Sequence, residues 1–309
     1  MSEKYFFGIE GGGSYSKLAL TDAAGKVLAA SESGSTSIYS VTKEQVFDNL
    51  SSLLESALES AGLRKADIGA GCIGSAGIGR EGEKILFQEF FDIILRPDFP
   101  VMLCGDGEIL LCGGLENLEG YCLIAGTGSI ALGRSAKGDL VRAGGHGYLL
   151  GDEGSGAWIG KSAIARTLRS LENRDLATDM SGAILEAAGL ARMEETIHYI
   201  HYSADKAKVA SIAPIVTAAA RKGDPLALDI LRIGAEELAL LVKSVIERSP
   251  WINRKELVLA GGVMKNDEIL VKTLKEILSR DFPALPVSSP KGTALQGACM
   301  LAISMGSKT

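Results

Sequence analysis

Two short glycine-rich segments of the chain, residues 10–14 (EGGGS) and 126–129 (GTGS), combine small residues with hydroxyl groups. Glycine lets the backbone turn tightly and brings its N–H groups against a ligand, and a serine hydroxyl adds a donor. Such turns bind phosphate without a helix, and a plain hairpin turn explains each one alone equally well. Glu10 differs from its neighbours, because an acid beside phosphates is costly unless it holds a cation such as Mg²⁺.

Asp106 is the candidate for proton chemistry. It follows a short apolar segment, residues 101–104 (VMLC), and precedes Gly107. Ligands of open α/β sheets collect at the carboxyl ends of strands. An aspartate at such an end can take the proton of a substrate hydroxyl during phosphoryl transfer. A helix N-cap explains the same residue, and the sequence leaves both interpretations open.

A third polar, glycine-rich segment covers residues 144–155 (GGHGYLLGDEGS). Its backbone and its side chains, among them His146 and Asp152, suit a polyol such as a sugar. Capping of the helix predicted to follow accounts for Asp152 or Ser155 equally well.

A fourth segment, residues 260–267 (AGGVMKND), follows a predicted strand and opens towards a helix. A nucleotide's phosphate or ribose meets a helix N-terminus in this way. A strand-to-helix turn without a ligand is the alternative.

Three other patterns are rejected as sites. Residues 160–162 (GKS) resemble the end of a Walker A loop, but they lie inside a predicted helix, and Ser155 occupies the place of the first glycine. His198 and His201 have no third ligand nearby. The five cysteines form no CxxC pair and lie in apolar surroundings, which predicts buried thiols in a reducing compartment. They are Cys72, Cys104, Cys112, Cys122 and Cys299.

The elements that must position these residues begin with strands and turns over residues 4–34, with a hairpin turn at 22–26 (DAAGK). Apolar residues at helical spacing predict a helix over 42–61, closed by Gly62. Further along, the patterns predict strands over 68–73, 101–104 and 257–259. They predict helices over 81–94, 154–171, 175–188, 193–202, 209–221, 225–248, 269–279 and 293–305.

The opening pattern returns in the second half of the chain. Residues 11–14 align with residues 126–129 at an offset of 115, and residues 24–30 (AGKVLAA) align with 137–143 (KGDLVRA) at an offset of 113. Two matches in the same order predict an internal duplication, in which each half starts with a three-stranded meander.

Composition limits the class of protein. The chain has 309 residues, 32 Lys+Arg and 38 Asp+Glu, with a net charge of −6, which argues against nucleic acid as the main partner. An apolar fraction of 46% with 23% charged residues excludes disorder. The 38 glycines are about 12% of the chain, against a usual 7%. No apolar run reaches the roughly 18 residues of a membrane span, and we expect no signal peptide and a cytoplasmic location.

Together, the four segments resemble the sugar kinase, hsp70 and actin superfamily, and within it the BadF/BadG/BcrA/BcrD-type ATPase group and its N-acetylglucosamine kinase branch. The resemblance runs over nearly the whole chain and is most specific in residues 144–160 (GGHGYLLGDEGSGAWIG). The other matching segments are 8–20 (GIEGGGSYSKLAL), 123–132 (LIAGTGSIAL) and 259–267 (LAGGVMKND). The resemblance implies an α/β fold of two ribonuclease-H-like (actin-like ATPase) domains with an inter-domain ATP cleft. The domains would be 1–113, joined by a C-terminal helix over about 293–309, and 114–292.

The resemblance also implies roles for single residues. Asp106 would be the catalytic base, and Mg²⁺ would bind near Glu10 and Asp106. ATP would contact Gly12, Gly13, Ser14, Lys17, Thr127, Gly128, Gly261, Gly262 and Asn266. The sugar would contact Ser35, Ser37, Ser129, Gly145, His146 and Asp152. Ser37 stands where this branch usually carries an asparagine, and the space gained would accommodate a larger amino sugar such as N-acetylmuramate.

The activity implied is ATP-dependent phosphorylation of the primary 6-hydroxyl of an amino sugar, N-acetylglucosamine first and N-acetylmuramate second, by a cytoplasmic homodimer with no nucleic-acid or membrane partner. One alternative in the same group is an ATPase that activates a 2-hydroxyacyl-CoA dehydratase, but its iron–sulfur cluster needs closely placed cysteines that this chain lacks. Another alternative, a sugar-responsive transcription regulator, needs a DNA-binding helix-turn-helix, and the first predicted strand begins at about Lys4.

Overall fold

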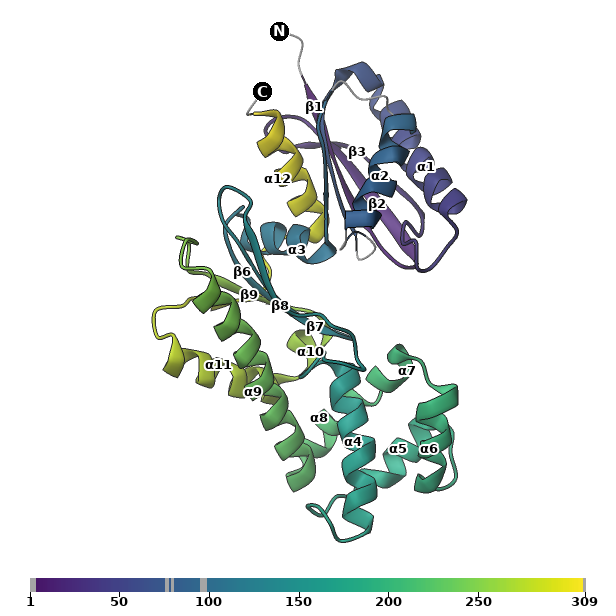
Figure 1. The fold of residues 1–309 in the computed structure, drawn as a ribbon, viewed down its shortest axis with the longest axis vertical. Helices are drawn as coiled ribbons and strands as arrows, with labels where there is room; N and C mark the ends of the chain where they lie inside the picture. Colours follow the sequence, from purple (N-terminus) through teal and green to yellow (C-terminus); the bar gives the residue numbers. More distant parts are fainter. Residues whose placement is uncertain (1–3, 76–77, 79–80, 95–98, 308–309) are drawn as a thin grey trace. The chain divides into compact units, whose positions relative to one another are not determined.

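The computed structural model describes residues 4–75, 78, 81–94 and 99–307, and it contains two five-stranded sheets with their helices (Figure 1). Contacts divide the chain into two units. The first unit takes in the chain up to Gly120, Arg134–Gly138 and the residues from Pro290 onwards; the second takes in Tyr121–Gly133 and Asp139–Ser289. The predicted α/β class with two domains of related topology is confirmed, whereas the domain limits placed near residue 113 stay a prediction.

The sheet of the first unit has the strand order β3-β2-β1-β4-β5. Its strands are β1 (Tyr5–Gly11), β2 (Tyr15–Thr21), β3 (Val27–Gly34), β4 (Ile68–Ser75) and β5 (Val101–Cys104). The first three form an antiparallel meander, and β4 and β5 run parallel to β1. Asp22 closes the β2–β3 turn, since its Oδ1 accepts hydrogen bonds from the N–H groups of Ala24 and Lys26, both at 2.9 Å.

One face of this sheet packs against α1 (Lys43–Ala61) and α2 (Glu81–Ile94). Thr42 starts α1 with a capping box, and Gly62 ends it in the left-handed conformation at φ 65°, as the sequence predicted. The core between sheet and helices is fully buried and includes Phe7, Ile9, Leu18, Leu20, Leu50, Leu54, Phe87 and Phe91.

The other face carries α3 (Asp106–Leu115) and α12 (Ala294–Gly306), so two segments that are far apart in the sequence lie side by side (Figure 1). The two helices pack with their backbones almost in contact. A Cβ on Gly113 would lie 1.8 Å from the carbonyl oxygen of Thr293, and one on Gly297 would lie 1.9 Å from that of Ile109. Only glycine fits at these two positions.

The sheet of the second unit has the order β8-β7-β6-β9-β10. Its strands are β6 (Gly120–Ala125), β7 (Ser129–Arg134), β8 (Leu140–Gly144), β9 (Leu257–Ala260) and β10 (Val287–Ser288). A meander followed by two strands on the far side of its first strand repeats the order of the first sheet. The shared strand order therefore agrees with the internal duplication that the sequence predicted.

Helices make up most of the second unit. They are α4 (Gly156–Leu171), α5 (Ser181–Ala188), α6 (Thr196–His198), α7 (Lys206–Ala210), α8 (Ala213–Arg221), α9 (Pro225–Arg248), α10 (Gly262–Asn266) and α11 (Glu268–Asp281). Their apolar faces form one core with β6 and β9, which includes Tyr121, Leu123, Ile230, Leu238 and Leu274. No helix in the described part of the chain combines the length and apolar character that a membrane span requires.

Three predicted helices of this unit were wrong in extent. The segment 209–221 is broken before Pro214, which occupies the first turn of α8 because proline has no N–H to donate. The segment 175–188 becomes helical only at Ser181, and before that point Thr178 Oγ1 and the N–H of Asp179 donate to Asp224 at 2.8 and 3.0 Å. Residues 193–203 form short 3₁₀, α and π turns in succession instead of one helix.

Candidate functional site

The carboxyl edge of the first sheet gathers most of the predicted site residues of that unit. Because β1, β4 and β5 are parallel, their carboxyl ends lie at the same edge. Gly12, Gly13 and Ser14 form the β1–β2 turn there, and Asp106 follows β5 by two residues. Glu10 of β1 and Cys104 of β5 both pair with Gly74 of β4, which puts these two backbones about 10 Å apart.

Glu10 also lies on the same face as Asp106. It pairs with Gly74, and a Cβ on Gly74 would meet Ile109 of α3 at 2.5 Å, so this register position faces the helix that Asp106 begins. Among the described residues, no three His, Cys, Asp or Glu side chains gather closely enough to hold a metal. Two oxygen ligands at one edge still fit Mg²⁺, which proteins commonly hold through one or two carboxylates together with substrate phosphates and water.

Asp106 is not the helix N-cap. Gly105 occupies that position without a side-chain bond, and Oδ1 of Asp106 accepts the neighbouring N–H of Gly107, at 2.9 Å. The side chain is exposed, yet the surrounding protein raises the pKa of its carboxyl by desolvation, while the Gly107 N–H opposes that rise. The capping interpretation of Asp106 therefore falls away, and what is left is a carboxylate with raised basicity at a strand end.

A network of hydroxyl groups fixes the Gly12 turn. Ser16 Oγ lies 2.8 Å from Thr36 Oγ1 and accepts the N–H groups of Thr36 and Gly12 at 3.1 and 3.3 Å. Ser35 Oγ donates to the carbonyl of Gly12 at 2.9 Å. Gly11 is required here, because a Cβ would lie 2.5 Å from Thr36 Oγ1. The turn predicted to bind phosphate is thus held by buried serine and threonine side chains.

Ser35 and Ser37, both predicted to contact the sugar, are buried beside this turn. Ser35 Oγ accepts the N–H of Ser37 at 3.1 Å, and Ser37 Oγ accepts that of Tyr39 at 3.4 Å. Sequence reasoning missed Asn49, whose Nδ2 donates to the carbonyl of Ser35 at 2.7 Å. An asparagine on a predicted helix gives no signal of that contact.

Lys17, predicted to contact phosphates, points its ammonium at Glu32 across β2 and β3, with 3.3 Å between Nζ and Oε1. Glu32 raises the pKa of Lys17 through this pair. Both side chains are exposed, so the pair contributes little stability and either partner is free to exchange for a stronger ligand.

The carboxyl edge of the second sheet brings together two segments that lie 135 residues apart in the chain. Because β6 and β9 are parallel and Ile124 pairs with Ala260, the 126–128 turn and Gly261 follow neighbouring strands. A Cβ on Gly261 would lie 2.3 Å from the carbonyl oxygen of Ala125, and one on Gly126 would lie 3.7 Å from the nitrogen of Gly262. The second predicted phosphate turn and the predicted nucleotide segment are in direct contact.

A cavity of about 760 Å³ opens beside this contact. Thr127, Gly262 and Asn266, which are predicted nucleotide contacts, line it together with Gly126 of the same turn. Its size is that of a site for a ligand of this class. The Nδ2 of Asn266 donates to the carbonyl of Gly262 at 2.8 Å, which keeps the side chain on the first turn of α10.

Four residues of helix α8 line this cavity, and the two with polar side chains, Thr217 and Arg221, were missed by sequence reasoning. Thr217 Oγ1 donates to Asp267 Oδ2 at 2.6 Å, and Asp267 in turn caps α11. Arg221 donates two hydrogen bonds of 2.6 Å to Glu268 at the start of α11. Their spacing of four residues on a helix was the only signal, and it is shared by most amphipathic helices.

The predicted sugar segment after β8 is tied to the same turn. Gly145 N–H donates to the carbonyl of Ser129 at 2.9 Å, and Ser129 Oγ donates to that of Glu153 at 2.7 Å. His146 is exposed. Ser155 caps α4 by accepting the N–H of Trp158 at 3.3 Å, so the capping interpretation holds for Ser155 and leaves Asp152 without that role.

Asp152 is buried, with a left-handed backbone at φ 60°. The ammonium of Lys206 lies 2.7 Å from its Oδ2, and the pair is an ionic contact without the direction of a hydrogen bond. A Cβ on Gly128 would lie 2.7 Å from both atoms. Asp152, Lys206 and the 126–129 turn thus form one charged cluster.

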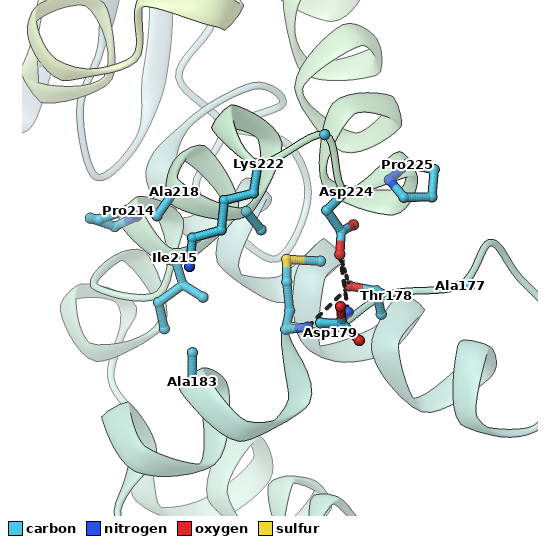
Figure 2. A pocket seen from close by; sticks show the side chains of 13 residues that line it. Ala177, Thr178, Asp179, Ala183, Pro214, Ile215, Ala218, Lys222, Asp224 and Pro225 are labelled. Carbon is cyan, nitrogen blue, oxygen red and sulfur yellow. Dashed lines mark hydrogen bonds between the residues drawn. The ribbon is translucent and has the colours of Figure 1, made fainter.

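A second cavity, of about 550 Å³, lies between α5 and α8 and includes none of the predicted site residues (Figure 2). One of its carboxylates, that of Asp224, is engaged in holding the chain. Asp224 caps α9 through Ala227 and also accepts hydrogen bonds from Thr178 Oγ1 at 2.8 Å and the N–H of Asp179 at 3.0 Å. We therefore assign the chemistry to the two sheet edges and not to this cavity.

The patterns rejected on sequence grounds have structural roles. The 160–162 segment lies within α4 and does not follow a strand directly. The rings of His198 and His201 contact that of Tyr202. All five cysteines are free and buried, which is the opposite of the accessible thiolates that a cluster bridging two subunits would need.

Comparisons with known proteins agree with this geometry. The model of the BadF/BadG/BcrA/BcrD ATPase family matches residues 7–302. An N-acetylmuramic acid/N-acetylglucosamine kinase of Clostridium acetobutylicum is 37% identical, covering 97% of this chain and 98% of the relative. An N-acetyl-D-glucosamine kinase of Dictyostelium discoideum is 27% identical, covering 98% and 99%.

Among solved structures, a Chromobacterium violaceum protein assigned provisionally as an N-acetylglucosamine kinase superposes with a TM-score of 0.72 at 28% identity, covering 97% of this chain and 99% of that one. The family model, the full-length relatives and the duplicated sheets with their paired glycine turns agree. The chain belongs to the BadF/BadG/BcrA/BcrD ATPase family.

Proposed function

We propose that this protein transfers the γ-phosphoryl group of ATP to the primary 6-hydroxyl of an amino sugar, either N-acetylglucosamine or N-acetylmuramate. It is an ATP-dependent sugar kinase, as are the curated relatives that match its full length. The observation that carries the proposal is the contact of the 126–128 turn with Gly262 beside a cavity of about 760 Å³.

The nucleotide is proposed to occupy that cavity, with Gly261, Gly262 and Asn266 beside the adenosine and Thr127 and Gly128 at the phosphates. Packed backbone N–H groups and the start of a helix favour phosphate oxygens. Arg221 adds a positive charge to the cavity wall, although Glu268 neutralises part of it. In the first unit, Gly12, Gly13, Ser14 and Lys17 are proposed as further phosphate contacts.

Asp106 is proposed as the base. Its carboxylate accepts the proton of the sugar 6-hydroxyl while that oxygen forms a bond to the γ-phosphorus, and the bond from the γ-phosphorus to the β–γ bridging oxygen breaks to release ADP. A raised carboxyl pKa makes Asp106 a better proton acceptor than an aspartate in water. Mg²⁺, held by Glu10 and Asp106, would neutralise charge on the phosphates.

The sugar is proposed to contact Ser129, Gly145, His146 and Asp152, together with Ser35 and Ser37. Backbone amides and a buried carboxylate suit a ligand rich in hydroxyl groups, because each hydroxyl both donates and accepts. The short side chain of Ser37 leaves room for an amino sugar with a large substituent. The cleft between domains, the homodimer and the cytoplasmic location remain predictions.

A coupled assay of ADP release tests the proposal with N-acetylglucosamine, N-acetylmuramate, glucosamine, glucose and no sugar. We expect turnover that depends on sugar and is highest with an N-acetylated amino sugar. The 6-deoxy analogue of the best sugar is the matched control, and we expect it to bind without releasing ADP. Equal ADP release with every sugar and with none would refute the kinase, and turnover with the 6-deoxy sugar would refute the position.

A further inference from the structure

The two side chains of the charged cluster, Asp152 and Lys206, differ in their exposure to solvent. The Asp152 side chain is only 3% exposed, whereas that of Lys206 is 36% exposed. No described residue donates a hydrogen bond to the buried Oδ2 of Asp152, although the Lys206 ammonium lies 2.7 Å away. Burying a carboxylate is costly even when an ammonium lies beside it, so this ion pair is weak evidence for a role in stability and is a candidate for a role in binding.

The cluster lies on one side of the 126–129 turn. Gly126 and Thr127 line the cavity of about 760 Å³, whereas Gly128, Asp152 and Lys206 do not. Gly128 is instead the residue against which Asp152 and Lys206 both lie. Lys206 therefore lies outside the cavity proposed for the nucleotide, and it is paired with Asp152, which the proposal gives to the sugar.

Lysine has three ammonium donors, and the contact with Asp152 Oδ2 occupies at most one of them. Because the Lys206 side chain is partly exposed, its remaining donors are available to a second anion. Helix α7 fixes its position, since Asp205 caps the helix by accepting the N–H of Lys208 at 2.8 Å, and Lys206 is the first helical residue. A sugar whose hydroxyl donates to Asp152 would bring a carboxylate on the neighbouring ring position to this ammonium.

We propose that Lys206 is the specificity-determining residue for an anionic amino sugar, and that it binds the lactyl carboxylate that distinguishes N-acetylmuramate from N-acetylglucosamine. The proposal rests on the proposed function and names the substrate class of the same site. Asp152 binds the ring hydroxyls that the two sugars share, and Lys206 recognises the group that only one of them carries. The charge of the pair also explains why Asp152 does not repel that carboxylate.

The test compares Lys206→Met, which keeps the length of the side chain but removes its charge, with Lys206→Arg and with Lys208→Met. Lys208 lies on the same short helix, and its ammonium donates to the carbonyl of Ser203 at 3.3 Å, so it is a matched control. The kcat and KM for N-acetylglucosamine, N-acetylmuramate and ATP are measured on one preparation of each variant. A ratio of kcat/KM values for the two sugars does not depend on the fraction of folded enzyme.

We expect Lys206→Met to lower the preference for N-acetylmuramate over N-acetylglucosamine by roughly 10- to 100-fold, the range for a hydrogen bond to a charged group. Lys206→Arg should restore most of the preference, and Lys208→Met should not change it. Calorimetric titration of N-acetylmuramate without ATP gives a second readout, and binding should weaken by a similar factor.

Three outcomes would overturn the proposal. An equal loss for both sugars would mean that Lys206 only supports Asp152. A rise in KM for ATP with an unchanged sugar preference would assign Lys206 to the phosphates. Wild-type protein that phosphorylates N-acetylglucosamine and ignores N-acetylmuramate would reject Lys206 as a carboxylate site and leave the kinase intact, whereas a wild type with no sugar-dependent turnover would reject the kinase itself.

Discussion

Gly261 is the position at which one added carbon should have the largest effect on the nucleotide side of the site. Its backbone, at φ 99° and ψ 167°, lies in a region that is essentially restricted to glycine and costs other residues about 1–3 kcal/mol. An alanine Cβ would also lie 2.3 Å from the carbonyl oxygen of Ala125 and 2.9 Å from the nitrogen of Gly126. Both neighbours are backbone atoms, so no side chain can rotate away.

The size of the effect follows from these distances. Real Cβ contacts essentially never fall under 3.0 Å, so β6 and the start of α10 must separate by about 0.7 Å or more. Overpacking of this kind costs about 1–3 kcal/mol, which together with the backbone strain gives about 2–6 kcal/mol for Gly261→Ala. A displacement approaching 1 Å at a phosphate turn is also expected to lower kcat/KM for ATP by roughly 100-fold.

Two neighbouring changes serve as controls. A Cβ on Gly262 meets no atom within 4 Å, so Gly262→Ala should leave the free energy of unfolding unchanged or raise it by about 0.4–1 kcal/mol. Gly182 in α5 has the same open surroundings and lies outside the proposed site, so Gly182→Ala is the control for activity. Urea unfolding and steady-state kinetics with ATP measure both effects. Equal stability of the Gly261 and Gly262 variants would refute the reasoning.

Three more predictions follow from other parts of the structure. Asp106→Asn should lower kcat by about 10²–10⁴-fold, because it removes the proposed base. It should not lower the melting temperature, because the raised carboxyl pKa means that the charged form of Asp106 destabilises the fold at pH values above the usual aspartate pKa. Wild-type kcat should fall as the pH drops through the raised pKa, because the base becomes protonated; a pH–rate profile and calorimetry measure these effects. Arg134→Met should lower the free energy of unfolding of the first unit by about 3–5 kcal/mol, because it leaves the buried Glu108 carboxylate unpaired. As the control, Arg64→Met in an exposed ion pair should lower it by under about 1 kcal/mol. Similar losses for the two variants in urea unfolding would contradict this prediction. All five cysteines should resist iodoacetamide at pH 8 in the native protein and react in urea, because all five are buried. Burial also raises the pKa of Cys112 to about 12 and that of Cys299 to about 11. Rapid labelling of any one thiol in the native protein would contradict this prediction.

Local signals in the sequence were enough to predict the limits of elements whose ends have capping residues. Thr42 and Gly62 mark the limits of α1, and the predicted helix over 81–94 and strand over 101–104 have the same bounds in the structure. The helix break before Pro214 had a signal that the periodicity of 209–221 obscured. In that segment apolar residues continue through the break, so spacing alone predicts one helix where proline dictates two.

Some residues of the candidate site could be predicted from local sequence signals, and others could not. The glycine turns were visible in the sequence because glycine is required where backbones approach closely, as Gly261 does at Ala125. Lys206 was not visible, because its partner Asp152 lies 54 residues earlier in the chain and the contact depends on where α7 packs. The buried ion pair of Arg134 and Glu108 was not predictable for the same reason, because neither residue type signals a partner in another element.

The interlocked glycines of α3 and α12 have a consequence for biosynthesis. All the strands of the first sheet have been translated once residue 104 is made, yet the helix that covers one of its faces begins only at Ala294. At 5–20 residues per second, the ribosome needs roughly 10–40 s to reach that helix. During this interval the nascent N-terminal sheet exposes apolar surface around Gly8 and Ala19, where Cys299 will later pack, and we expect chaperones to protect it until synthesis is almost finished.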